Sequence, residues 1–134
     1  MKNLNVLLFL SLTILLFSCK KDKPLSHALA GQWELTTGVS GLDGVKTEYA
    51  PGLGNITKFT DTEYEIMRDG KTINKGTYSI ISYKSLITKK EEKQIVYDGK
   101  ANDVIKNYFT INDKKLIISV DAYDGPSSIF TKIN

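Results

Sequence analysis

The sequence predicts an all-β domain, an antiparallel up-and-down β-barrel of about eight strands, with an open β-sandwich as the alternative. Beyond Ala30, apolar and polar residues alternate with period two over most of the chain, which is typical of strands with one buried face. Turn dipeptides separate these segments at short intervals and leave little room for crossover helices. Closing such a meander into a barrel would hide its edge strands.

The first eighteen residues have the pattern of a signal peptide. Lys2 gives a positive start, Leu4 to Phe17 are mostly apolar, and the small Ser18 precedes Cys19. The apolar run is too short for a comfortable transmembrane helix, which needs about 20 residues. We therefore expect residues 1–18 to be removed rather than retained as a membrane span.

Leu16-Phe17-Ser18-Cys19 resembles the lipobox of bacterial lipoproteins. The resemblance implies that the leader is cut before Cys19, that its thiol receives a diacylglycerol, and that the new amino terminus is acylated. Each CH₂ group of an acyl chain that is buried in the membrane contributes about 0.8 kcal/mol to membrane binding, so two or more acyl chains anchor a protein firmly. An Asp directly after the cysteine would imply retention at the inner membrane, but this position is Lys20. The resemblance therefore implies the outer membrane, and the protein could face either the periplasm or the cell surface. The alternatives to lipidation are that Cys19, the only cysteine, is a free thiol or is lost with the leader.

Residues 19–28 are expected to form a tether between the lipid anchor and the domain. They are charged or small, contain Pro24 and show no apolar period. His27, the only histidine, has no neighbouring ligand that would complete a metal site. We expect His27 to be solvated, and the folded domain to span residues 29–134.

The alternating segments predict which side chains face the interior. They are Trp33 and Leu35, Tyr64 and Ile66, Tyr78 and Ile80, Phe109 and Ile111, and Leu116, Ile118 and Val120, with Ser128–Ile133 as the last strand.

Reversals are predicted between these strands. Asp69-Gly70 is a strong two-residue hairpin signal because both positions require positive φ. Asp98-Gly99 and Asp124-Gly125-Pro126 mark further turns. The segment Leu42–Gly54, rich in glycine and containing a proline, is expected to be a long loop, and residues 101–106 a helical turn.

Gly31-Gln32-Trp33 resembles the G-x-W signature at the start of lipocalin-type barrels. Together with the meander over residues 59–80 and the closing segment 127–134, it is similar to the small lipocalin-like domains of bacterial lipoproteins. The resemblance implies that Trp33 plugs the closed end and that a basic residue of the last strand, here Lys132, packs across it; such a pair contributes about 0.5–1 kcal/mol. In the alternative, Ile129 and its odd-numbered neighbours face inward and Lys132 is exposed.

A barrel of eight strands is either filled by its own side chains or holds one small ligand. We expect a small hydrophobic ligand in or near the barrel, and the alternative is a protein-interaction or inhibitor module with a solid core, displayed at the cell envelope. The residues expected to line a ligand site are Tyr64, Ile66, Tyr78, Ile80, Phe109 and Ile118.

Composition argues against several other classes of function. The net charge of +3, or +2 once the leader and its Lys2 are removed, is too small to indicate nucleic-acid binding. No convergent acid, base and nucleophile is evident, so we expect no enzymatic activity, no cofactor, no metal and a monomer. The acidic and hydroxyl residues weighed as catalytic candidates, and set aside as solvated strand faces or turns, are Glu63, Glu65, Asp121, Asp124, Ser127 and Ser128.

Overall fold

The computed structural model of the chain describes residues 25–133. The expected signal peptide, Cys19 and residues 20–24 lie outside this range, as does Asn134. The elements, in chain order, are α2 (Leu25–Leu29), β1 (Gly31–Val39), β2 (Lys46–Glu48), β3 (Ile56–Phe59), β4 (Glu63–Arg68), β5 (Lys71–Lys84), β6 (Glu91–Tyr97), β7 (Asn107–Asn112), β8 (Lys115–Val120) and β9 (Ser127–Lys132).

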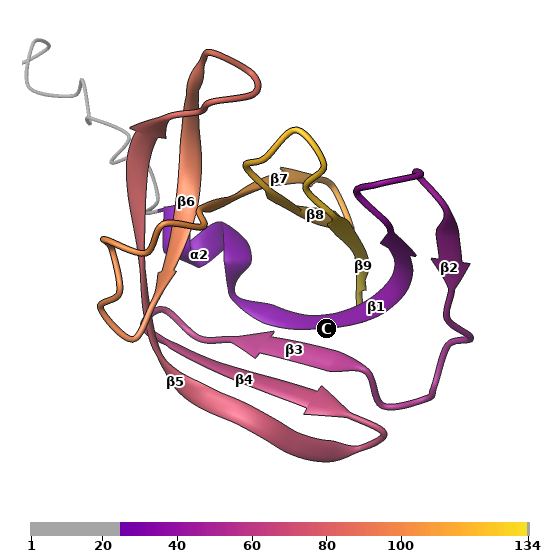
Figure 1. The fold of residues 1–134 in the computed structure, drawn as a ribbon. Helices are drawn as coiled ribbons and strands as arrows, with labels where there is room; N and C mark the ends of the chain where they lie inside the picture. Colours follow the sequence, from indigo (N-terminus) through magenta and orange to yellow (C-terminus); the bar gives the residue numbers. More distant parts are fainter. Residues whose placement is uncertain (1–24, 134) are drawn as a thin grey trace, which may run out of the picture.

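The strands form an antiparallel meander that curls into a barrel (Figure 1). Eight of the nine strands follow the order β6-β5-β4-β3-β1-β9-β8-β7, with β2 paired to β1 off this path. The first and last long strands pair with each other, Trp33 opposite Lys132 and Val39 opposite Ser127. The predicted all-β, up-and-down barrel is therefore confirmed, and the open sandwich is not observed.

Backbone hydrogen bonds do not close the barrel all the way round. β6 and β7 are in contact, but no ladder joins them in the part of the chain that the structure describes. The first half of β5 pairs with β4 and its second half pairs with β6. The β5–β6 hairpin thus leaves β4 after Thr77 and folds toward β7. We call the line between β6 and β7 the seam.

β5 changes partners beside Gly76, where a Cβ atom would lie 2.0 Å from Asp98 Oδ1. Asp98 accepts hydrogen bonds from the Thr77 backbone N–H (3.1 Å) and the Tyr64 hydroxyl (2.9 Å). The position requires glycine because this carboxylate occupies the space of a side chain. The contacts fasten β4, β5 and the end of β6 together.

The predicted Asp-Gly turns are present. Asp69 and Gly70 have φ angles of 49° and 74°, and Asp98 and Gly99 have φ angles of 51° and 72°. Both central residues of each turn are left-handed, as a type I′ turn requires.

Two predicted loop assignments need correction. The segment 42–54 contains β2, three exposed residues that pair with the far half of β1. Residues 101–106, expected to be a helical turn, form turns and bends without a helix. Val104 and Ile105 point to solvent there, so no apolar face is buried that would stabilise a short helix.

The N-terminal boundary also differs from the prediction, because residues 25–28 of the expected tether form α2 with Leu29. Leu29 is fully buried, and its carbonyl accepts a 2.7 Å hydrogen bond from Trp33 Nε1. The helix thus covers the end of the barrel. The alternation that predicted strands could not show this, because a single buried leucine has no period.

One hydrophobic cluster fills the barrel. Its members come from α2 and all the strands except the short β2, and they alternate along each strand as expected. They are Leu29, Trp33, Leu35, Phe59, Tyr64, Tyr78, Ile95, Phe109, Leu116 and Phe130. Each such buried side chain stabilises the fold by about 1.5–3 kcal/mol.

Candidate functional site

The G-x-W residues form the floor of the barrel. Gly31 has a φ of 132°, a conformation that residues with a Cβ rarely adopt. Trp33 is fully buried, and Lys132 Nζ lies 5.0 Å from the centroid of its ring. The register that pairs Trp33 with Lys132 places both side chains on the inner face. The cation therefore packs across the indole.

The six residues expected to line a ligand site all belong to the core or pack against it. Tyr64, Tyr78 and Phe109 are buried members of the cluster, and Ile66, Ile80 and Ile118 are partly buried against it.

The two tyrosines of this set are satisfied by protein partners. The Tyr78 hydroxyl donates to the Thr60 carbonyl at 2.6 Å, and its ring meets Phe59 edge to face, with centroids 5.1 Å apart. Tyr64 donates to Asp98, and its ring meets Tyr97 at 4.6 Å. Burial raises the pKa of both hydroxyls, and the neighbouring carboxylates Asp98 and Asp61 raise them further. These tyrosines are core residues, and their neutral hydroxyl groups are hydrogen-bonded to Asp98 and Thr60.

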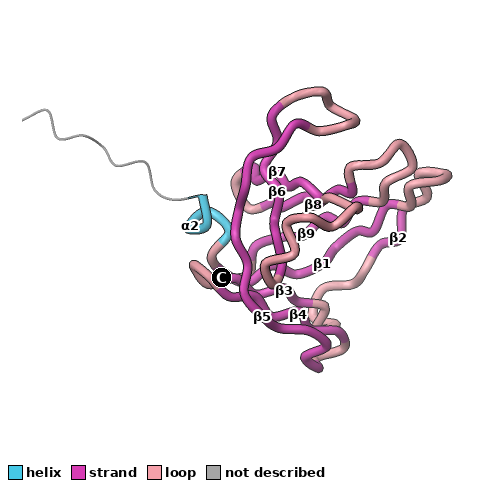
Figure 2. Tube along the Cα trace, turned by 60° about the vertical axis from the view of Figure 1, so that its left-hand side comes forward, coloured by secondary structure: helices cyan, strands magenta, loops and turns pink. Residues whose placement is uncertain are grey.

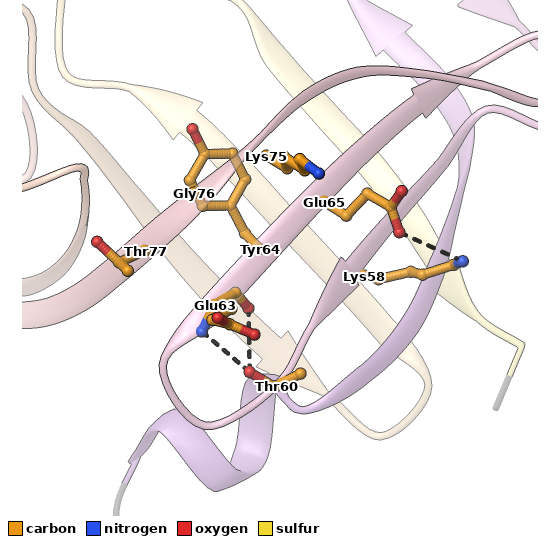
Figure 3. A pocket seen from close by; sticks show the side chains of 8 residues that line it. All are labelled: Lys58, Thr60, Glu63, Tyr64, Glu65, Lys75, Gly76 and Thr77. Atoms are coloured by element: carbon orange, nitrogen blue, oxygen red, sulfur yellow. Dashed lines mark hydrogen bonds and ion pairs between the residues drawn. The ribbon is translucent and has the colours of Figure 1, made fainter.

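One depression on the described residues has a volume of about 610 Å³ and opens to solvent over β3, β4 and β5 (Figure 3). Its lining residues are Lys58, Thr60, Glu63, Tyr64, Glu65, Lys75, Gly76 and Thr77. The charges there are engaged with one another: Lys58 Nζ lies 3.4 Å from Glu65 Oε2, and Thr72 donates to Glu65 at 2.5 Å. The Thr72 hydrogen bond lowers the pKa of Glu65. This is a solvated strand face with paired charges.

Two other depressions also lie at the surface. One, of about 390 Å³, runs between α2 and β5 past Leu25 and Ile81, and one of about 400 Å³ surrounds the β7–β8 turn. Ile66, Phe109 and Ile118 line none of the three. Tyr64 lines the first depression, and Tyr78 and Ile80 line the second.

Asp121 has a structural role that the sequence did not indicate. Its buried carboxylate accepts hydrogen bonds from Ser85 Oγ (2.6 Å), Leu86 N (2.8 Å) and Ile87 N (3.2 Å). Burial by itself raises the pKa of Asp121, but these hydrogen bonds outweigh it and lower the pKa. The carboxylate thus ties the β5–β6 loop to the β8–β9 loop across the seam. Ser85 lies 36 positions away, so no local pattern reveals the pair.

Three buried polar atoms lie near the seam: Gln94 and Asn107 are on β6 and β7, which border it, and Tyr83 is on the neighbouring β5. Tyr83 Oη, Gln94 Oε1 and Asn107 Oδ1 have no hydrogen-bond partner among the described residues. Lys106 Nζ lies 5.2 Å from the centroid of the Tyr83 ring. Burial, and after it the charge of Asp121, raises the pKa of Tyr83 well above its ordinary value. β6 and β7 are thus in contact without a backbone ladder, and the Asp121 hydrogen bonds link the loops on this side of the barrel.

Two loops at the end opposite α2 lie against each other. We call residues 40–45 and 121–126 the loop pair. A Cβ on Gly41 would lie 1.6 Å from the Asp124 carbonyl oxygen, so the two backbones are in direct contact. Leu42 and Tyr123, beside this contact, are 86% and 91% exposed. Figure 2 shows α2 at the left and the loops around β2 at the right.

The described residues contain no group of three or more His, Cys, Asp or Glu that could hold a metal ion. His27 lies on α2, exposed, with Nδ1 3.5 Å from Asp61 Oδ1. Over residues 25–133, no helix is long and apolar enough to cross a membrane.

No protein-family model, curated protein or solved structure matches this chain. The lipocalin resemblance therefore depends on the G-x-W motif and on the barrel itself.

Proposed function

We propose that the protein is a lipid-anchored lipoprotein of the bacterial outer membrane whose monomeric barrel is a non-catalytic protein-binding module. The lipobox motif ending at Cys19 and the apolar leader before it support the anchor. α2 begins six residues after Cys19, so the proposed anchor attaches at that end of the barrel. The loop pair then lies at the far end.

The observation that carries this proposal is that the inward side chains of the barrel pack into one hydrophobic cluster. The inward tyrosines donate to Thr60 and Asp98 rather than into a void, and the three depressions open to solvent. A barrel filled by its own side chains binds through its surface. Exposed apolar side chains on braced loops are the surface feature best suited to a protein partner.

A small apolar ligand is the second candidate. Ile66, Ile80 and Ile118 are only partly buried although they face the core, and the seam lacks a backbone ladder. A ligand entering there would have to displace core side chains from one another.

Two experiments test the proposal. Metabolic labelling with a radioactive fatty acid is expected to label the wild-type protein and to fail with Cys19→Ser, which should move to the soluble fraction. Native mass spectrometry of the protein purified in mild detergent, with lipid released by later activation, should give the mass of the acylated chain alone. An additional co-purifying small molecule, displaced by Ile118→Trp, would instead support the ligand candidate.

A further inference from the structure

The loop pair is built from two rigid turns. In residues 40–45, Ser40 N donates to the Val45 carbonyl at 2.9 Å, and Val45 N donates to Asp43 Oδ1 at 3.1 Å. In residues 121–126, Gly125 N donates to the Ala122 carbonyl at 3.0 Å. Preformed loops lose little conformational entropy on binding.

The apolar side chains of the loop pair have no part in this bracing. The contact between the loops is made by the Gly41 backbone against Asp124 and Gly125, which leaves Leu42 and Tyr123 free on either side of it. Val45, in the same turn as Leu42, is also exposed. Two neighbouring loops thus present a leucine, a valine and a tyrosine to solvent at one place. Tyrosine is among the residues enriched in the hot spots of protein interfaces, and Leu42 and Val45 add apolar area beside it.

The charge of the loop pair is acidic. Its only carboxylates are Asp43, Asp121 and Asp124, and it contains no Lys, Arg or His. Asp121 is turned inward to Ser85. Asp43 and Asp124 are exposed, and hydrogen bonds from Ser40 and Val45 lower the pKa of Asp43. The first cation beyond the loops is Lys46, at the start of β2. Two carboxylates therefore flank the apolar tips.

The described chain begins at α2, at the other end of β1 from the loop pair. Five residues separate Cys19 from Leu25, and these six Cα–Cα steps reach at most about 22 Å. β1 runs from α2 to the loop pair over nine residues, or roughly 26 Å at 3.3 Å per residue. An anionic membrane surface would also repel the two carboxylates.

From these observations, and resting on the proposed function, we infer that the loop pair docks a protein partner with an apolar pocket for Leu42 and Tyr123, rimmed by Lys or Arg that face Asp43 and Asp124. The geometry makes the two loops one contact surface, directed away from the anchor. Charge pairing at the rim sets the association rate, and the apolar anchors set the lifetime of the complex.

Site-specific photocrosslinking of the full-length protein in the bacterium that produces it tests this inference. A photoreactive amino acid at position 42 or 123 is expected to give one protein adduct of the same mass. The matched positions 73 and 104 also carry exposed apolar side chains, with Ile73 on the β4–β5 hairpin and Val104 98% exposed in the β6–β7 loop. These positions should not give that adduct.

Second substitutions then test the chemistry of the surface. With the photoreactive group at 123, Leu42→Ser should lower the adduct yield about tenfold, as truncation of an anchor does. Ile73→Ser should leave the yield within twofold. Asp43→Lys should also lower it, and the wild-type yield should fall as salt is raised. An unchanged thermal midpoint for each variant shows that the fold is kept.

The possible failures are distinguishable. Adducts from positions 73 or 104 but not from 42 or 123 would overturn the loop pair as the surface while leaving the proposed function intact. Absence of a protein adduct from all four positions would count against both. Lipid adducts at 42 and 123 would make a membrane the occupant, and an adduct of twice the chain mass would make it a second copy. Either result overturns the stated partner.

Discussion

Asp121→Ala should weaken the fold by releasing the β5–β6 hairpin. The substitution removes the acceptor of three hydrogen bonds, from Ser85 Oγ, Leu86 N and Ile87 N. Ile87 N keeps a second acceptor, Ser85 Oγ, at 3.1 Å, so the main losses are one orphaned backbone N–H and one hydroxyl that loses a charged partner. Together these cost about 2–4 kcal/mol of unfolding free energy.

Urea denaturation measures this loss, with Asp124→Ala as the matched control. Asp124 lies in the same loop and is exposed, so its substitution should change the unfolding free energy by less than about 0.5 kcal/mol. Amide hydrogen exchange should also accelerate in residues 78–97 of Asp121→Ala, because the hairpin tip is no longer tied down. Equal midpoints for the two variants would refute the role assigned to the carboxylate.

The pH dependence gives an independent check on the same residue. The folded pKa of Asp121 lies below its ordinary value of 3.8, so ionised Asp121 stabilises the native state above that pH. The contribution is lost as the pH falls through the folded pKa. The stability of the wild-type protein should therefore fall below about pH 4 more steeply than that of Asp121→Ala. Parallel curves below pH 4 would contradict the assignment.

Three further substitutions test the floor and the core. Lys132→Met should lower the unfolding free energy by about 0.5–1 kcal/mol and shift the fluorescence of Trp33, the only tryptophan; an unchanged spectrum would argue against the cation above the ring. Gly31→Ala should cost about 1–3 kcal/mol because the φ of 132° strains any residue with a Cβ, and a wild-type urea midpoint would contradict that strain. Leu116→Ala should cost about 2–5 kcal/mol in the same assay, since Leu116 is fully buried; a smaller loss would show that the core relaxes into the space.

Local periodicity was sufficient to predict β1, β4, β5, β7, β8 and β9 and most of their inward residues, but it did not assign β2, β3 or β6. Trp33 and Leu35 are buried as the alternation of β1 predicts, and the same holds for Tyr64 and Phe109. Type I′ turns require left-handed backbone at both central residues, so Asp69-Gly70 marked its hairpin correctly. These features depend on residues within a few positions of one another.

Features that depend on distant residues were not predictable in this way. The two-partner pairing of β5 and the seam follow from how the barrel closes, and the bond between Ser85 and Asp121 joins loops 36 positions apart. Alternation shows which face of a strand is inside, but not whether the inside is full. That outcome depends on how side chains from opposite strands interdigitate, as Tyr64 does with Tyr97.

The pairing of β1 with β9 has a consequence for the time at which the domain can fold. A chain that crosses a membrane amino end first delivers β1 early and β9 last, about ninety positions later in the sequence. Until β9 arrives, β1 and β8 each lack a neighbour, and the indole of Trp33 lacks the lysine that covers it. Pairings at such separation form slowly, so the barrel is complete only once β9 is available to pair with β1.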